Sequence, residues 1–345
     1  MIQRLNPTGL LSGVTAFKAI SEGLALPLAG GALGFSQLET IKNVSNGGFE
    51  TQMAPIDDVN LDLSMLIGER LPFAGMGLKR PIVMGVVNVT PDSFSGGGFL
   101  EAKEAIDHTH HIASEGVDFV DIGGESTRPG ATSLSESKEI SRVLPVIEAA
   151  VAAGLRVSVD TSRASVMRVA IEAGASIIND VTALTGDPDA LEVVASSNVS
   201  VILMHMQGRP QTMQHAPSYQ FASVEIFDWL MRRIEVCMGV GIPRNRIVVD
   251  PGIGFGKNDG HNIDLLDRAA MFHGTGCAVA IGVSRKSFIG RLAGANKPCK
   301  RLSGTIAATM IALSRGVQIH RVHDVAEARQ AIAVWNAFNS GNGRS

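Results

Sequence analysis

From about residue 80 onward, the chain repeats one pattern in which a short apolar run is followed by a helical stretch. Eight such runs are rich in β-branched residues and bounded by Gly, Pro or polar residues, which is typical of parallel strands buried on both faces. The predicted strands cover residues 82–88, 119–123, 156–160, 176–180, 201–205, 246–250, 278–284 and 317–322. Amphipathic patterns between and after them predict helices at residues 137–153, 163–173, 221–240, 302–314 and 325–338.

This repeat predicts an α/β protein with helices around a parallel sheet. Eight strands within the roughly 265 residues that follow residue 80 match the usual size of a closed (β/α)8 TIM barrel. A doubly wound open sheet is the alternative, but it usually has fewer strands and a glycine-rich turn after the first one. Here the first run leads into NVTPDSF at residues 88–94. We therefore expect the barrel over residues 80–345 and an N-terminal extension of unknown role over residues 1–79.

The composition excludes several classes of protein. With 30 Lys and Arg against 33 Asp and Glu, the chain has no general basic surface for nucleic acid. Its longest stretches without a charged residue are shorter than the roughly 20 apolar residues that span a membrane. The three cysteines, Cys237, Cys277 and Cys299, are far apart and show no metal-ligand spacing. We expect a soluble cytoplasmic protein with reduced thiols.

Polar residues stand at or just beyond the carboxyl end of nearly every predicted strand. In a barrel, these ends meet on one face, where such enzymes place their sites. Helix capping explains single Asp or Asn residues, but it does not call for Lys, Arg and His. The residues are Asn88, Asp121, Asp160, Asn179 with Asp180, His205, Asp250, Arg285 with Lys286, and Arg321 with His323.

These residues predict a ligand with two chemically different ends. Three segments, TRPG at 127–130, SRKS at 284–287 and RVH at 321–323, offer the cations and hydroxyls that suit a phosphate or pyrophosphate. Asp160, Asn179 and Asp250 offer carboxylate and amide groups that can pair with the amino–amidine edge of a flat heterocycle. Buried carboxylates need partners, so a ligand or Lys286 must satisfy them.

Other motifs are weaker. The segment GIGFGK at 252–257 fails the P-loop pattern and is interpreted as a loop that lets the backbone approach a ligand. His108, His110 and His111 are interpreted as a solvated helix face rather than a metal site. His205 is equally consistent with a buried core histidine, and we leave it out of the predicted site.

The ordered motifs resemble those of dihydropteroate synthases over about residues 81–338. The resemblance rests on MGVVNVTPDSFS at 84–95 and DIGGESTRPGA at 121–131, followed in the family's order by six shorter segments. These are SVDT at 158–161, IIND at 177–180, MHM at 204–206, DPGIGFGK at 250–257, SRKS at 284–287 and RVHD at 321–324.

The resemblance implies a folate-pathway transferase. It would join 6-hydroxymethyl-7,8-dihydropterin diphosphate to 4-aminobenzoate, giving 7,8-dihydropteroate and pyrophosphate. The family pattern also implies a homodimer and a site with Mg²⁺ as its cofactor. Position by position, it assigns pterin binding to Asp160, Asn179, Asp250 and Lys286. It assigns the Mg²⁺ and diphosphate contacts to Asn88, and further diphosphate contacts to Arg128, Arg321 and His323. It assigns the aminobenzoate pocket to Thr127, Pro129, Phe255 and Ser287. It assigns the catalytic roles to Asp160, Lys286 and Arg128.

Two features depart from the family pattern. Gly96 stands where the family usually has Asp, which removes a likely carboxylate partner for Arg128. The first 80 residues exceed what most members have, and they fit a packed extension, an oligomerisation arm, a regulatory piece or a surface appendage that shields the bottom of the barrel. Two alternatives therefore stay open: a methyltetrahydrofolate–corrinoid methyltransferase and a weakly active or silent pterin-binding paralogue.

Overall fold

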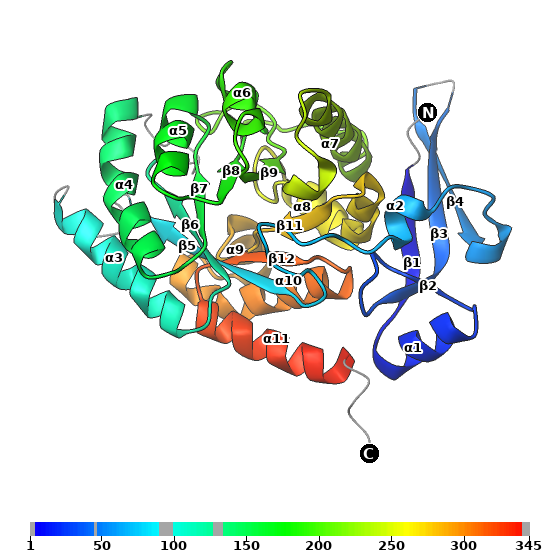
Figure 1. Ribbon diagram of the computed structural model, residues 1–345. Helices are drawn as coiled ribbons and strands as arrows, with labels where there is room; N and C mark the ends of the chain where they lie inside the picture. Colours follow the sequence, from blue (N-terminus) through cyan, green and yellow to red (C-terminus); the bar gives the residue numbers. More distant parts are fainter. Residues whose placement is uncertain (1–3, 45–46, 90–98, 127–133, 340–345) are drawn as a thin grey trace.

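The structure, a computed structural model, describes residues 4–44, 47–89, 99–126 and 134–339. Eight parallel strands close into a barrel, each paired with the next in chain order and the last with the first (Figure 1). This confirms the predicted α/β barrel and excludes the open sheet. The strands are β5 (Ile82–Asn88), β6 (Phe119–Gly123), β7 (Val157–Asp160), β8 (Ile177–Asp180), β9 (Ser200–Met204), β10 (Ile247–Asp250), β11 (Ala278–Ile281) and β12 (Ile319–Val322).

Helices surround this barrel on its outer side (Figure 1). They are α3 (Phe99–Ser114), α4 (Glu136–Ala152), α5 (Ala164–Glu172), α6 (Ala190–Ala195), α7 (Ala222–Gly239), α8 (Asp259–Asp267), α9 (Ser287–Ala293), α10 (Leu302–Ser314) and α11 (Val325–Asn339). Short 3₁₀ turns add η2 (Arg244–Arg246), η3 (Ala269–Thr275) and η4 (Pro298–Lys300).

The predicted bounds differ from the observed ones mainly at strand ends. The strand predicted over 278–284 ends at Ile281, because the chain turns at Ser284 and Arg285, and Arg285 has a φ of 58° that a strand cannot contain. The strand predicted over 201–205 ends at Met204, which leaves His205 in the loop that follows. Both shifts place predicted polar residues in loops rather than on strands.

Two layers of apolar side chains build the barrel. The outer layer lies between strands and helices, where Val83, Val120 and Val249 are fully buried. The inner layer fills the barrel itself with residues such as Met84 and Phe119. Strands covered on both faces in this way read as near-continuous apolar runs, which is why the sequence pattern identified them.

The residues before the barrel form a four-stranded antiparallel sheet that lies beside it, blue at the right of Figure 1. Its central strand, β3 (Gly34–Asn43), pairs with β1 (Leu5–Leu11), β2 (Leu26–Pro27) and β4 (Phe49–Pro55). The helices α1 (Gly13–Ser21) and α2 (Ser64–Ile67) and the turn η1 (Ile56–Asp58) complete this region. No repeated sequence pattern predicted the sheet, since its first strand contains Pro and Gly, which are depleted in strands.

Ion pairs and apolar contacts join this sheet to the barrel. Arg4 donates two hydrogen bonds to Asp228 on α7, of 2.8 and 2.6 Å. Arg268 donates two to Glu39 on β3, of 3.1 and 3.0 Å. The backbone N–H of Gly13 donates to Asn339 Oδ1 at the end of α11. The sheet is therefore packed against the barrel through residues far apart in the sequence.

The linker between sheet and barrel contributes to the barrel core. Phe73 is 1% exposed, and with Met76 it packs into the inner apolar layer that contains Ile82 and Ile177. This linker thus packs into the bottom of the barrel, while the role of the whole extension stays open. The division into an extension over 1–79 and a barrel over 80–345 stays a prediction. Within the described residues, no helix is long and apolar enough to cross a membrane.

Candidate active site

A hollow with about 460 Å³ of empty space lies at the carboxyl ends of the barrel strands. Its lining brings together residues from the ends of five strands (β7, β8, β9, β10 and β12) and from the loops that follow β8, β10, β11 and β12. The polar residues at the strand ends can form one functional site only if they line the same cavity. Among the predicted site residues, those lining it are Asp160, Asn179, Asp250, Phe255, Lys286, Arg321 and His323.

The other predicted residues lie at the margin of this hollow or beyond the described residues. Asn88 ends β5 and is half-buried. A Cβ built on Gly123 would lie 3.9 Å from Asn88 Oδ1 and 3.5 Å from Asp160 Cβ, so both side chains border the same glycine. Ser287 is exposed at the start of α9. Thr127, Arg128, Pro129 and Gly96 lie outside the described residues.

A buried carboxylate, Asp121, organises one wall of the site. It is 0% exposed and accepts hydrogen bonds from Ser158 Oγ (2.7 Å), Asn179 Nδ2 (3.2 Å) and Arg321 Nε (2.7 Å). Arg321 Nη2 also donates to Asp160 Oδ2 at 3.0 Å. Sequence reasoning placed Asp121 at a strand end but left it out of the site. Its inward register opposite Ser158 on the next strand is the signal that could have found it.

Burial changes the proton affinity of the carboxyl groups in this wall. Burial raises the pKa of Asp160 to about 7, with Arg321 acting in the opposite direction and Asp121 adding to the rise. Asp180 is not among the residues that line the hollow, but burial likewise raises its pKa to about 6, although three hydrogen bonds from Thr182 and Leu184 oppose the rise. Strongly shifted carboxyl groups in a cavity are typical of functional sites.

Lys286 lies in the loop between β11 and α9, and its side chain contacts the loop that follows β10. Its Nζ donates to the carbonyl oxygen of Ile253 at 2.7 Å and lies 4.0 Å from the centre of the Phe255 ring. Burial lowers its pKa to about 8, with Asp250 acting in the opposite direction. A lysine near neutrality can switch between donating as a cation and as a neutral amine.

Asp250 is held by the backbone of its own loop. Its Oδ1 accepts a hydrogen bond of 2.7 Å from the N–H of Gly252. Burial raises the pKa of Asp250, while this hydrogen bond and the charge of Lys286 lower it. Of the two partners expected for the buried carboxylates, a ligand or Lys286, the Lys286 side chain donates to the Ile253 carbonyl in this structure.

Acidic and basic groups are interleaved around the hollow. Arg321 lies between Asp121 and Asp160, so the expected separation into an acidic end and a basic end is wrong for this wall. The physical reason is that buried carboxylates need a partner, and Arg321 supplies one within the protein. His323 lies nearby. Its ring Nδ1 is 3.0 Å from Ser284 Oγ, and its backbone N–H donates to the same oxygen at 3.1 Å.

The residues fit a magnesium ion only if the substrate supplies most of its ligands. No group of three or more His, Cys, Asp or Glu side chains in the described part of the chain could hold a metal. Asn88 offers an amide oxygen, a hard ligand of the kind that Mg²⁺ accepts. Mg²⁺ often binds through one or two protein groups together with substrate phosphates, and Asn88 fits that arrangement.

A second set of charged residues anchors the polypeptide on both sides of residues 127–133. Arg163, which follows β7, donates to Glu139 Oε2 (2.5 Å), Glu125 Oε1 (3.3 Å) and the carbonyl oxygen of Leu134 (2.8 Å). Thr161 Oγ1 also donates to Glu139, at 2.7 Å. Sequence reasoning read Arg163 only as the start of a helix, so this anchor was missed.

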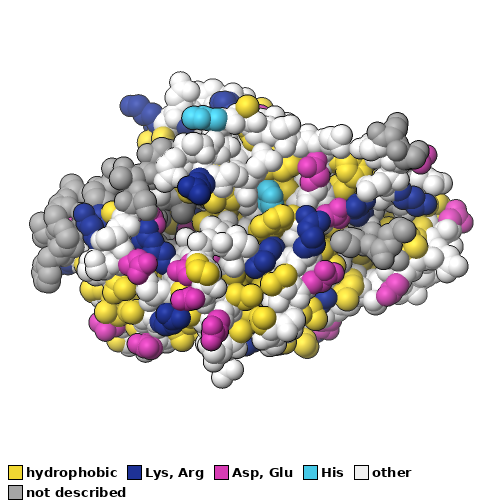
Figure 2. Space-filling view, turned by 90° about the horizontal axis from the view of Figure 1, so that it is seen from above, with side chains coloured by type: hydrophobic (Ala, Val, Ile, Leu, Met, Phe, Trp, Pro, Cys, Tyr) yellow, Lys and Arg dark blue, Asp and Glu magenta, His cyan; other side chains and the backbone are white. Residues whose placement is uncertain are grey.

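The face shown in Figure 2 has basic and acidic side chains scattered among each other rather than gathered into one basic patch. The expectation that the protein does not bind nucleic acid stays a prediction.

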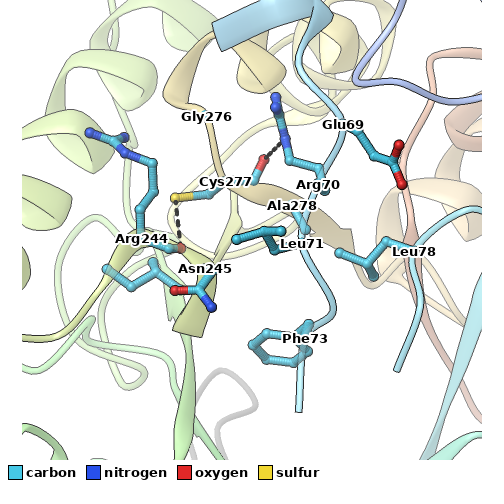
Figure 3. A pocket seen from close by; sticks show the side chains of 11 residues that line it. Glu69, Arg70, Leu71, Phe73, Leu78, Arg244, Asn245, Gly276, Cys277 and Ala278 are labelled. Carbon is cyan, nitrogen blue, oxygen red and sulfur yellow. Dashed lines mark hydrogen bonds between the residues drawn. The ribbon is translucent and has the colours of Figure 1, made fainter. Parts of the chain in front are cut away.

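Another hollow, of about 510 Å³, lies between the linker and the amino ends of β10 and β11 (Figure 3). Arg70 lines it, but its guanidinium is engaged by carbonyl oxygens, including that of Cys277 at 3.1 Å. Cys277 is buried, and burial raises the pKa of its thiol to about 11, which makes it a poor nucleophile. Barrel enzymes place their sites at the other end, and so does the strand-end pattern here.

Comparison with known proteins identifies the family. The family model described as "Pterin binding enzyme" matches residues 84–323. The dihydropteroate synthase of Escherichia coli K12 is 45% identical over 264 residues, covering 76% of this chain and 93% of the relative. The dihydropteroate synthase of Neisseria meningitidis serogroup B is 44% identical over 270 residues, covering 76% of this chain and 94% of the relative.

Solved structures give the same answer. The Xanthomonas albilineans dihydropteroate synthase with 4-aminobenzoic acid is 46% identical, with a TM-score of 0.73, and covers 78% of this chain and 97% of its own. The same enzyme in complex with 7,8-dihydropteroate is 43% identical, with a TM-score of 0.70, and covers 76% of this chain and 95% of its own. A closed barrel, a shared strand-end cavity and these relatives agree, and the chain belongs to the pterin-binding enzymes as a member of the dihydropteroate synthase family.

Proposed function

We propose that this protein is a transferase of folate biosynthesis that condenses 6-hydroxymethyl-7,8-dihydropterin diphosphate with 4-aminobenzoate. The products are 7,8-dihydropteroate and pyrophosphate. The observation that carries the proposal is the single hollow in which Asp160, Asn179, Asp250, Lys286 and Arg321 meet. The relatives solved with 4-aminobenzoic acid and with 7,8-dihydropteroate support one substrate and the product.

The pterin ring is held by the acidic and amide groups of the hollow. Asp160, Asn179 and Asp250 offer the acceptors that an amino–amidine edge requires, and Lys286 offers a donor from the facing loop. Burial makes each of these hydrogen bonds stronger than it would be in water, because competing solvent is excluded. The Asp121 network fixes Asn179, because Asn179 Nδ2 donates to Asp121.

The diphosphate lies beside Arg321 and His323, which are positioned by Asp121 and Ser284. The family resemblance assigns Arg128, which lies outside the described residues, to the same group. When bound, Mg²⁺ supplies charge neutralisation on the diphosphate, with Asn88 as its protein ligand. The corrinoid methyltransferase alternative lacks support, since the TRPG and SRKS segments offer aminobenzoate and anion contacts that it does not need.

The reaction breaks the bond between the pterin methylene carbon and the diphosphate oxygen, and both bonding electrons leave with pyrophosphate. Arg321 and the other cations stabilise the charge that grows on this leaving group. The positive charge that develops at the methylene is stabilised by the dihydropterin ring and by the carboxylate of Asp160. The aminobenzoate nitrogen then forms the new C–N bond and releases a proton. This sequence needs no protein nucleophile.

The aminobenzoate lies against Phe255 and Ser287, and the family resemblance also assigns it Thr127 and Pro129, which lie outside the described residues. Phe255 is half-buried at the hollow, and Ser287 is exposed at the first turn of α9, which suits a substrate that enters last.

The protein acts as a cytoplasmic homodimer in this proposal. Apolar side chains are exposed on neighbouring helices, among them Ile311 of α10 (46%), Val334 (57%) and Phe338 (79%) of α11. Large exposed apolar side chains on packed helices favour a protein–protein contact, and closed two-fold dimers are the commonest assemblies.

A coupled pyrophosphate-release assay on the full-length protein tests the proposed activity. Release that requires both the dihydropterin diphosphate and 4-aminobenzoate supports the synthase. Pterin binding without release supports the silent paralogue, for which Gly96 and the extension are the only arguments.

A further inference from the structure

Lys257 is a buried lysine that the proposed mechanism does not use, and burial lowers the pKa of its amine well below the ordinary value. It lies in the loop between β10 and α8 and is 1% exposed. Its Nζ lies 2.8 Å from the carbonyl oxygen of Phe255, 3.3 Å from that of His205 and 3.1 Å from His205 Nδ1. Three acceptors from two loops therefore surround one amine, which is unusual for a lysine because lysines are rarely fully buried.

The protonation of His205 agrees with this geometry. Burial lowers the pKa of His205 to about 2, and the charge of Lys257 lowers it further. A neutral imidazole can accept a hydrogen bond at Nδ1, whereas a protonated one cannot. Lys257 thus donates toward the ring, and the His205 ring in turn packs edge-on against Trp229, with centroids 4.9 Å apart.

The backbone of the two loops is in close contact around Lys257. A Cβ on Gly252 would lie 2.0 Å from the carbonyl oxygen of His205, and one on Gly256 would lie 2.3 Å from that of Gln207. Both glycines have positive φ, of 71° and 62°. The loop between β10 and α8 is consequently pressed against the end of β9, and Lys257 joins the two by hydrogen bonds.

The same loop places Phe255 in the active site. Lys257 binds the carbonyl oxygen of Phe255, and the ring of that residue lies 4.0 Å from Lys286 Nζ. Tyr219 holds the following residue, since its hydroxyl donates to the carbonyl oxygen of Gly256 at 3.0 Å. The position of the Phe255 ring therefore depends on contacts made behind it, away from the hollow.

We propose that Lys257 is a positioning residue of this active site, which ties the Phe255 carbonyl to the end of β9 and thereby holds the Phe255 ring against Lys286. The inference rests on the proposed function, in which Phe255 contacts 4-aminobenzoate. Lys257 itself does not line the hollow, so it acts through Phe255 rather than by touching a substrate.

A double-mutant cycle tests this role. Lys257→Met removes the donors but keeps an unbranched side chain, and we expect it to raise the KM for 4-aminobenzoate about tenfold, with a smaller change in kcat. In a Phe255→Leu background the ring is absent, so the same substitution changes that KM less than about threefold. Lys257→Arg retains donors and gives an intermediate value.

Arg246→Met is the matched control. Arg246 also donates to carbonyl oxygens, those of Val194 and Val199, but it lies at the amino end of β10. We expect this variant to lose stability while its KM for 4-aminobenzoate stays unchanged. If Lys257→Met does not fold, Lys257→Arg replaces it in the cycle with the same expected non-additivity.

Two results separate the possible failures. Equal KM effects of the Lys257 substitution in both backgrounds, or no effect in either, would overturn the positioning role while leaving the enzyme intact. An unsubstituted protein that releases no aminobenzoate-dependent pyrophosphate would overturn the proposed function, and the inference with it.

Discussion

Asp160 is the residue on which the proposed chemistry depends most. It lies in the hollow, is bound by Arg321 Nη2 at 3.0 Å, and has a pKa that burial raises to about 7. A raised pKa means that the folded protein favours the protonated form, so ionising this carboxyl costs stability. Such a cost at an active site is typical of groups retained for function rather than for stability.

Replacing Asp160 separates these two roles. We expect Asp160→Asn to lower kcat at least 100-fold, because the amide has no charge to stabilise a cation at the methylene. The fold survives, since Arg321 keeps its bond to Asp121. Steady-state kinetics and thermal unfolding at pH 8 measure the two effects. Turnover near that of the unsubstituted protein would remove Asp160 from the mechanism.

The pH profile follows from the same shifts. The Asp160 pKa is raised to about 7 and that of Lys286 is lowered to about 8, so kcat/KM rises through the first value and falls through the second. The effect of Asp160 on the free energy of unfolding has the opposite sign to that of a carboxyl whose pKa is lowered on folding. Protonated Asp160 stabilises the fold fully below pH 3.8, and this stabilisation is lost as the pH rises through about 7. A profile that is flat between pH 6 and 9 would contradict these assignments.

Several site residues were predictable because of where they stand in the sequence. Asp160, Asn179 and Asp250 end apolar runs, and a barrel brings such ends together. Asp121 was misjudged because it lies within a strand, where only the register with Ser158 shows that it faces inward. The sequence shows Lys257 only as part of a glycine-rich loop. Its burial results from contacts with the end of β9, which the local sequence does not predict.

At the scale of elements, the barrel strands and the N-terminal sheet differ in how well the sequence predicts them. Strands buried on both faces are apolar throughout, so β5 and β6 were predicted with their observed bounds. In the N-terminal sheet, β4 is mostly exposed and β1 contains Pro7 and Gly9. Their pairing depends on β3, a contact between distant residues that a local pattern cannot show.

Arg268 is the side chain that joins this sheet to the barrel most extensively. It donates two hydrogen bonds to Glu39 and one to Asp264, and its guanidinium lies 4.9 Å from the centre of the Phe221 ring. We expect Arg268→Met to lower the free energy of unfolding by about 1–3 kcal/mol, since it removes the cationic partner of two part-buried carboxylates. Among the described residues, Glu39 then keeps only the hydrogen bond from Asn6 Nδ2, and Asp264 only that from the Ser223 N–H. Denaturant unfolding measures the change.

A control exists in Arg315, whose partner Asp267 is 59% exposed at its side chain. Exposed pairs are worth roughly 0–1 kcal/mol, so Arg315→Met should change stability much less than Arg268→Met. Equal effects of the two substitutions would show that the sheet does not stabilise the barrel through Arg268.

On the scale of the whole molecule, the site is at one end of the barrel and the linker closes the other. Phe73 and Met76 fill the bottom from the N-terminal side, whereas the functional groups gather at the carboxyl ends. Stability and chemistry thus occupy opposite ends of one barrel. This division could be predicted for the barrel from the repeat, but the linker's role in it could not.

The proposed homodimer is tested by charge insertion. Ile311→Glu places a carboxylate on the exposed face of α10, and we expect it to convert a dimer into monomers in sedimentation velocity. Val236→Glu is the matched control, because Val236 is exposed to a similar extent, 42%, but lies on α7. An unsubstituted protein that sediments as a monomer, or a dimer that both variants retain, would contradict this interface.

The most direct measurement is pyrophosphate release by the full-length protein, with each substrate omitted in turn and with Asp250→Asn assayed beside it. The arrangement of Asp160, Asp250, Lys286 and Arg321 in one hollow predicts release only when dihydropterin diphosphate and 4-aminobenzoate are both present, and much slower release by the variant. Release that ignores 4-aminobenzoate, or none at all from a folded protein that binds the pterin, would contradict it.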